Sequence, residues 1–152
     1  MESEETKKPR GGNRNRSVGH NFERTVALKL REIGFPHVVT SRSESRNRDN
    51  DGIDLINKNE LVNGRLPYNI QCKSMVGRVP YQKLLKELPA GTGAMNVVFH
   101  QFTEKRGSQF YAIGHYAIVD MEEFLKMVTK LEDNRKYIDA LLKELNDEKS
   151  VD

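Results

Sequence analysis

The hydrophobic pattern changes from irregular to helical near the start of the chain. Residues 1–16 have no apolar periodicity and are rich in Gly, Asn and Arg, which predicts a flexible, partly basic tail. From Ser17 or Gly19, apolar residues recur every three to four positions until Gly34, a residue that commonly stops helices. The stripe that predicts this first helix consists of Phe22, Val26, Leu30 and Ile33.

Short apolar runs with alternating polar residues predict strands in the middle of the chain. The expected strands cover 37–41, 52–57, 68–73, 96–102 and 109–114, and 115–119 either continues the last strand or adds another. The polar segment 42–51 is expected to be a loop, in which Asp51 forms a turn. The Asn63-Gly64 pair indicates a hairpin that would make the strands on either side of it antiparallel.

Helical patterns account for most of the remaining sequence. Residues 81–88 follow Pro80 and predict a short helix, whereas Asp120 and Glu123 predict a capping box at the start of a later one. A final helix is expected at 135–145, packed on its own domain or, alternatively, used as a dimer interface. The order of elements predicts a single α/β domain over 17–152, with a central mixed sheet of about five strands flanked by helices.

Composition limits the classes of protein to consider. The 152 residues are 36% hydrophobic and 31% charged, which fits one globular domain with a sizeable core. The sequence has no apolar run of about 20 residues and no charged-then-apolar leader, so we expect neither a membrane span nor a secretory signal. An intracellular, cytoplasmic protein is expected. The single cysteine, Cys72, cannot form an internal disulfide and is expected in the core.

The formal net charge of +3 hides an asymmetry along the chain. Residues 14–48 contain eight Lys and Arg against three Asp and Glu, whereas 120–152 contain six against ten. Lys and Arg supply sequence-independent affinity for nucleic-acid phosphates. The basic segment therefore suggests nucleic-acid binding, with an ordinary solvated surface as the alternative.

Two neighbouring predicted strands carry polar groups suited to phosphate chemistry. Side chains alternate along a strand, so Gln71 and Lys73 share one face while Cys72 takes the other. Asp54, between apolar Ile53 and Leu55, can join the face of Gln71 and Lys73. Carboxylate and amide oxygens suit Mg²⁺, which is held by few protein ligands and can promote phosphodiester hydrolysis. The sequence thus predicts a metal-dependent nuclease.

These segments resemble the PD-(D/E)XK nuclease superfamily, and within it they most resemble the archaeal-type Holliday junction resolvases. The resemblance covers roughly residues 17–130. One departure is that Gln71, a neutral and weaker ligand, stands where most members carry Glu or Asp. The matching segments are Gly19-His20-Asn21-Phe22-Glu23, Gly34-Phe35, Ser41, Gly52-Ile53-Asp54-Leu55 and Ile70-Gln71-Cys72-Lys73.

The resemblance implies a role for each of these positions. Glu23, Asp54 and Gln71 would bind Mg²⁺, or Mn²⁺ in its place, with the backbone carbonyl of Cys72 as a further ligand, and Lys73 would assist the attacking water. A homodimer acting on the symmetric strands of a four-way junction is implied as well. The candidate DNA contacts, which in the alternative view belong to an ordinary tail and loop, are Arg14, Arg16, Ser41, Arg42, Arg46 and Arg48.

Two other functions fit the same residues. The first is a repair, restriction or replication nuclease acting on ends, flaps or duplex sites. The second is a DNA-binding module that has lost catalysis, motivated by Gln71. The four histidines have no mutual metal-binding spacing and are expected to be scattered polar or packing residues.

Overall fold

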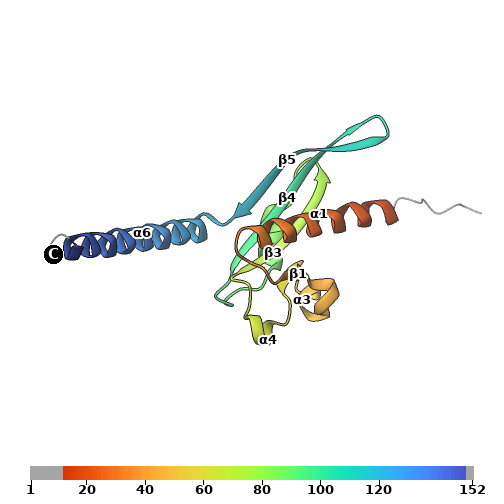
Figure 1. The fold of residues 1–152 in the computed structure, drawn as a ribbon. Coiled ribbons are helices and arrows are strands. Elements are labelled where there is room, and N and C mark those ends of the chain that lie inside the picture. Colours follow the sequence, from red (N-terminus) through yellow and green to blue (C-terminus); the bar gives the residue numbers. More distant parts are fainter. Residues whose placement is uncertain (1–11, 150–152) are drawn as a thin grey trace, which may run out of the picture. The chain divides into compact units, whose positions relative to one another are not determined.

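The computed structural model describes the backbone of residues 12–149 and the side chains of residues 16–149. The protein is α/β, as predicted, and it divides into two compact units, the first ending at Ile118 and the second beginning at Val119. The first unit contains the sheet and most of the helices (Figure 1). The second contains one long helix, α6 (Met121–Lys149).

The sheet has five strands in the order β1-β2-β3-β4-β5. β1 pairs antiparallel with β2, β2 antiparallel with β3, and β3 parallel with β4, so the predicted mixed sheet is confirmed. A parallel pair requires a crossover, and α5 (Tyr81–Glu87) lies within the connection between β3 and β4. The strands are β1 (Val38–Thr40), β2 (Leu55–Asn57), β3 (Tyr68–Val76), β4 (Met95–Arg106) and β5 (Gln109–Val119).

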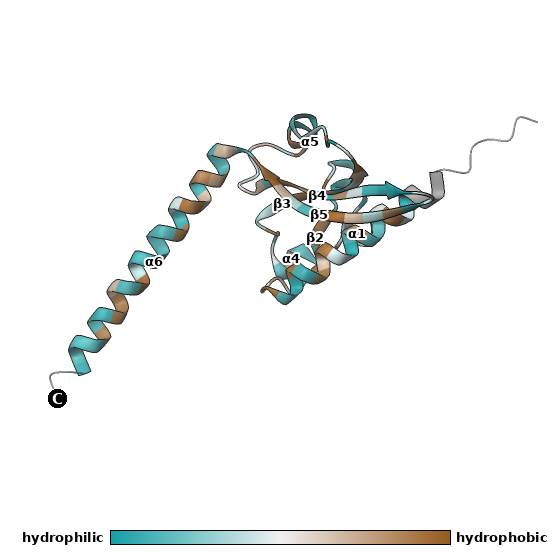
Figure 2. Ribbon diagram, turned by 90° about the horizontal axis from the view of Figure 1, so that it is seen from above, coloured by the Kyte–Doolittle hydropathy of each residue, from teal (hydrophilic) through white to brown (hydrophobic). Residues whose placement is uncertain are grey.

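Helices cover both faces of this sheet (Figure 2). α1 (Gly12–Glu32) packs Phe22, Val26 and Leu30 into a cluster that includes Ile70 and Cys72 of β3. On the other face, Leu84 of α5 packs against Val98 of β4, which lies level with Gln71 in the register. Alternation along β3 therefore sends Cys72 towards α1 and Gln71 towards the opposite face. The expectation that Cys72 is a core residue is confirmed.

The first helix differs from the prediction at both ends. It begins at Gly12, so residues 12–16 are helical rather than part of a flexible tail. It ends at Glu32, and Gly34 follows with φ +117° as expected for a stop, but Ile33 is 72% exposed and does not join the core stripe. Ile33 does not pack in the core because it lies beyond the last helical residue, where the helical period no longer sets the direction of its side chain.

The prediction that residues 42–51 form a loop without helices was wrong. The segment forms two short helices, α2 (Ser41–Glu44) and α3 (Arg46–Asn50), and Ser45 caps α3 by accepting a hydrogen bond from the Arg48 backbone N–H. Asp51 ends α3, which agrees with its expected place in a turn. Helices of one turn have too few residues to produce an apolar period, so the pattern could not reveal them.

The connection between β2 and β3 corrects another expectation. The two strands are antiparallel as predicted, but Asn63-Gly64 does not form a two-residue hairpin. Asn63 ends a short helix, α4 (Glu60–Asn63), and Gly64 is its C-cap with φ +73°. The positive φ that favours glycine in a hairpin turn also favours it at the end of a helix, which explains the misreading.

The C-terminal half largely follows the sequence. Pro80 precedes α5, and β5 runs through 115–119 without a break. Asp120 caps α6 by accepting hydrogen bonds from the backbone N–H groups of Glu122 and Glu123. The two separate helices expected here are instead one, because the polar run at 132–135 does not interrupt α6. Among the residues that the structure describes, no helix is both long and apolar enough to cross a membrane.

Candidate active site

Asp54 is fixed at the entry to β2 by three backbone contacts. Its N–H donates to the Ile70 carbonyl at 2.8 Å, and its carbonyl accepts from the Ser41 N–H at 2.8 Å. The carboxylate Oδ2 accepts a hydrogen bond from the Cys72 N–H at 2.6 Å. A carboxylate held by β3 in this way has one oxygen engaged and a defined orientation.

Glu23 reaches the same region from α1. Its neighbour Phe22 and Val26, one turn later, are buried in the core, and this packing turns Glu23 inwards until it is only 4% exposed. A nearby cation, Arg42 of α2, lies with Nη2 3.5 Å from Glu23 Oε1. Glu23 is therefore a buried carboxyl group and not an exposed surface residue.

The two carboxyl groups influence each other. Burial raises the pKa of Glu23 to about 7, the negative charge of Asp54 adds to this rise, and Arg42 and Lys73 oppose it. Burial also raises the pKa of Asp54, whereas the Cys72 N–H and Lys73 counteract that shift. Lys73, half-buried on β3, is thus close enough to act on both carboxyl groups. Two cations, Arg42 and Lys73, therefore face two carboxyl groups whose pKa values are nonetheless raised by burial.

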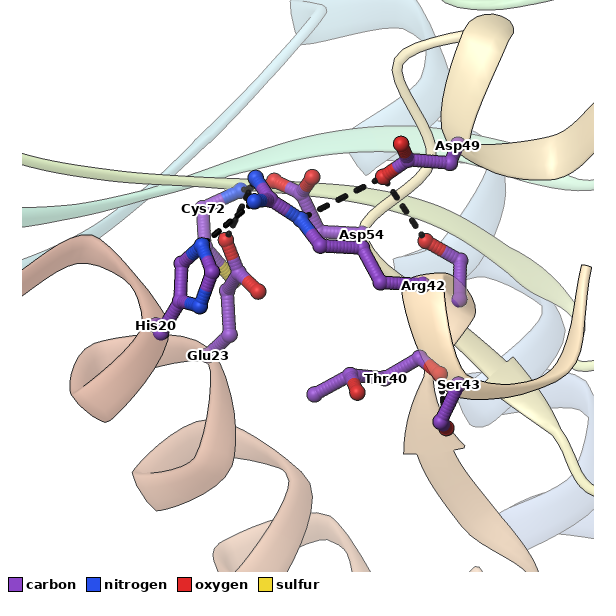
Figure 3. A network of polar contacts seen from close by, with 9 residues as sticks. His20, Glu23, Thr40, Arg42, Ser43, Asp49, Asp54 and Cys72 are labelled. Atoms are coloured by element: carbon purple, nitrogen blue, oxygen red, sulfur yellow. Dashed lines mark hydrogen bonds and ion pairs between the residues drawn. The ribbon is translucent and has the colours of Figure 1, made fainter. Parts of the chain in front are cut away.

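Arg42 links the elements around this site (Figure 3). Its guanidinium contacts the His20 imidazole through Nη1, Glu23 through Nη2, and Asp49 Oδ1 through Nε at 3.4 Å. Burial is the main cause that lowers the pKa of His20, followed by the charge of Arg42, so a neutral imidazole can accept from the guanidinium. The same Asp49 oxygen accepts from Ser41 Oγ at 3.5 Å.

Sequence reasoning missed His20 and Asp49 as members of the site. His20 precedes Glu23 by three residues, which places both on one helical face, and this spacing was a usable signal. Asp49 gave no such signal. It reaches Arg42 only because α2 and α3 fold back beside each other.

Gln71 occupies a different environment from the two carboxyl groups. It is buried at 7% exposure, and among the described residues its Oε1 has no hydrogen-bond partner. Its amide lies against Gly52, where an added Cβ would be 3.4 Å from Nε2. Gly52 has φ +76°, so glycine suits this position for its backbone as well as its size. An unpartnered buried acceptor is costly unless something outside the chain satisfies it.

The oxygen atoms of Glu23, Asp54 and Gln71 are the type of ligand that a hard cation prefers. In the part of the chain that the structure describes, no three His, Cys, Asp or Glu side chains converge to hold a metal ion. The available donors are instead the carboxyl groups of Glu23 and Asp54 and the unpartnered amide oxygen of Gln71. Mg²⁺ takes oxygen ligands, needs few from protein, and keeps several waters.

The candidate DNA contacts lie in unlike places. Arg16 and Arg46 are exposed, while the side chain of Arg14 lies outside the described residues. Arg48 forms an ion pair with Glu60 at 3.1 Å, and Arg42 belongs to the carboxylate cluster. Ser41 is fully buried and bonds to Asp49, so it supports the site and cannot reach a phosphate in this structure.

Comparison of the chain with family models, curated proteins and solved structures finds no match. The chemistry of the site therefore rests on its own residues.

Proposed function

We propose that this protein is a Mg²⁺-dependent DNA endonuclease with a PD-(D/E)XK-type core, and that it cuts four-way junctions. The observation that carries the proposal is the approach of two carboxyl groups, the buried Glu23 of α1 and the partly buried Asp54 just before β2, to the ammonium of Lys73 on β3. Structural carboxylates are more often exposed or fully paired. Two of them with raised pKa values beside a lysine are typical of a site that binds a cation or moves protons.

In this proposal each residue has a defined task. Asp54 and Glu23 would hold the ion, with the carbonyl of Cys72 as a further ligand, whereas the Gln71 amide, directed to the face of β3 opposite α1, would have to reach the ion around the strand. When bound, Mg²⁺ supplies positive charge to the scissile phosphate and acidifies water. Lys73 places a compact positive charge where negative charge develops on the phosphate, and the Cys72 N–H keeps Asp54 oriented.

Arg42 and His20 have supporting tasks in this scheme. Arg42 partly compensates the negative charge of Glu23 and Asp49, which keeps α2 and α3 against the site. His20 accepts from Arg42 and thereby fixes the direction of its guanidinium. Both are positioning residues, since neither is assigned a contact with the reacting atoms.

The proposal is tested by incubating the full chain with a labelled four-way junction and a matched linear duplex, with and without Mg²⁺. We expect paired nicks in the junction, little cutting of the duplex, and no cutting without the metal. Lys73→Ala should reduce the cleavage rate at least about 100-fold while junction binding persists. Lys83→Ala, which removes an exposed lysine of α5 far from the motif in sequence, is the matched control and should cut normally.

One observation favours a second candidate, a DNA-binding module without catalysis. Gln71 is neutral, and alternation places it on the face of β3 opposite Cys72. A protein that binds the junction but cuts no junction, flap, end or duplex with Mg²⁺ or Mn²⁺ would establish this candidate. Preferred cutting of flaps, ends or duplex sites would keep the hydrolytic site but replace the junction as substrate. Equal cutting by Lys73→Ala would refute the site itself.

A further inference from the structure

The long helix α6 carries a set of apolar side chains that are not buried. None of its 29 residues is buried, and large apolar residues recur from Met121 in its first turn to Leu145. Figure 2 shows these residues as brown segments that alternate with teal along the helix. An exposed apolar stripe of this length marks an interaction surface.

The stripe follows a seven-residue repeat. If Met121 is position a, the a and d positions of four consecutive heptads are all apolar except one. The a positions are Met121, Val128, Arg135 and Leu142, and the d positions are Phe124, Leu131, Ile138 and Leu145. Six of the seven apolar members are between 36% and 59% exposed, and the seventh, Met121, is 71% exposed.

The period of the repeat identifies the kind of partner. A helix seated on a globular surface follows the 3.6-residue period with a broad apolar face, whereas a strict 3.5-residue repeat fits another helix with the same repeat. A second copy of this chain supplies such a helix with the same length and register. No other described helix of this chain has comparable length and an unburied stripe, since α1 buries its apolar face against the sheet.

The charges beside the stripe favour one orientation. In a parallel pair, each g residue faces the e residue five positions later in the other helix, and the g residues Met127, Asn134 and Leu141 are uncharged. No like charges meet there. In an antiparallel pair, the e residues of one helix face the e residues of the other. The registers in which the two helices overlap most then bring Glu132 against Glu132 or Asp139 of the other copy, which places like charges together.

Arg135 is the one polar residue in the a and d set. Its Nη2 lies 2.8 Å from Oε2 of Glu132 on the same helix, so its charge is already compensated. A polar residue at a single a position fixes the register and the number of strands at a cost in stability. In a parallel, in-register pair Arg135 faces Arg135 of the second copy, and the ion pair of each arginine with Glu132 of its own helix offsets this like-charge contact.

We propose that α6 forms a parallel, in-register two-stranded coiled coil with α6 of a second copy of this chain. The protein is then a homodimer joined through its C-terminal helices. This inference rests on α6 alone, so it stands or falls independently of the nuclease proposal.

Sedimentation equilibrium of the full chain tests the proposal. The wild type should sediment as a dimer at micromolar concentration. Ile138→Glu places a charge at a central d position and should weaken dimerisation at least about 100-fold. Tyr137→Glu is the matched control, because Tyr137 is the adjacent residue, is 66% exposed and lies at position c, outside the seam. This variant should remain dimeric. Circular dichroism of the full chain reports whether each variant is folded.

Three results would overturn the proposal. The first is a wild type that stays monomeric at about 100 μM, and the second is a dimer that survives both Ile138→Glu and Leu131→Glu. The third concerns orientation: Leu131→Cys should form an interchain disulfide readily on oxidation, because identical d residues face each other in a parallel pair. A dimer in which Leu131→Cys crosslinks no faster than Tyr137→Cys would exclude the parallel register. Cys72 is buried and does not compete.

Discussion

Glu23 is a carboxyl group whose behaviour is set by its neighbours rather than by its own chemistry. At 4% exposure, with Asp54 nearby, its pKa rises to about 7, so in the metal-free protein it carries a proton for much of the time at neutral pH. Its proximity to Arg42 and Lys73 limits that rise. A cation bound beside it would favour the ionised form and draw the proton away.

The raised pKa of Glu23 predicts how the stability of the metal-free protein depends on pH. The folded state binds this proton more tightly than the unfolded state, for which the ordinary value of 4.5 applies. The resulting stabilisation is fully present below about pH 4.5 and is lost as the pH rises through 7. We expect the free energy of unfolding, measured with urea in EDTA, to fall by about 1–3 kcal/mol between pH 5 and pH 8 from this group.

Glu23→Gln provides the control for this dependence. Gln keeps the size of the side chain and remains neutral, so the variant should unfold at higher urea than the wild type at pH 8 and show a weaker pH dependence between 5 and 8. A variant with the same pH dependence as the wild type would show that Glu23 does not titrate in this range.

At the scale of elements, short helices and tight turns bring the site together. α2 and α3 carry Arg42 and Asp49, and the turn after α3 places Gly52 against the amide of Gln71. Gly52 has both a positive φ and a close neighbour, whereas Gly19, inside α1, has no atom within 4 Å of an added Cβ. Replacing each glycine by alanine would therefore affect the stability of the fold differently at the two positions.

This difference predicts opposite effects of the same substitution. Gly52→Ala should destabilise the protein by about 1–2 kcal/mol, because alanine is strained at φ +76° and its Cβ would press on Gln71. Gly19→Ala should stabilise it by roughly 0.5–1 kcal/mol, because alanine is the better residue within a helix. Urea denaturation of both variants measures the two effects. Equal effects of the two substitutions would mean that the turn at Gly52 is not strained by a side chain.

For the whole molecule, the uneven charge along the chain is the feature that bears on DNA binding. The basic segment 14–48 includes α1, α2 and most of α3, which are the elements next to the candidate site, whereas the acidic segment 120–152 contains α6. Favourable contacts with phosphates are therefore expected from the first unit, and α6 is expected to contribute little to them.

This polarity predicts a salt-dependent affinity for DNA. Junction binding, measured without metal by electrophoretic mobility shift, should weaken at least about tenfold between roughly 50 and 200 mM salt, since counterions are released on binding. Arg46→Ala removes an exposed candidate contact and should make the slope shallower, whereas Lys143→Ala on α6 should leave it unchanged. A slope near zero for the wild type would argue against binding to the phosphate backbone.

Agreement between sequence and structure depends on how long each pattern is. The strands and the helix α1 were predictable because alternation or helical periodicity extends over enough residues to identify a buried face, as in α1 and β4. The short helices α2, α3 and α4 were not, and neither were the contacts of Arg42 with His20 and Asp49. Those contacts join residues up to 22 positions apart, and no local pattern records them.

The sequence by itself determined the α/β class, the order of the strands along the chain and the place of Cys72 in the core. Each follows from periodicity or composition, which are local properties of the chain. Only the tertiary structure decided that Glu23 is buried beside Asp54, that Arg42 compensates them, and that Gln71 faces away from Cys72 with an unpartnered oxygen. These properties depend on which elements pack together, because burial and the distance between charges are set by residues remote in sequence.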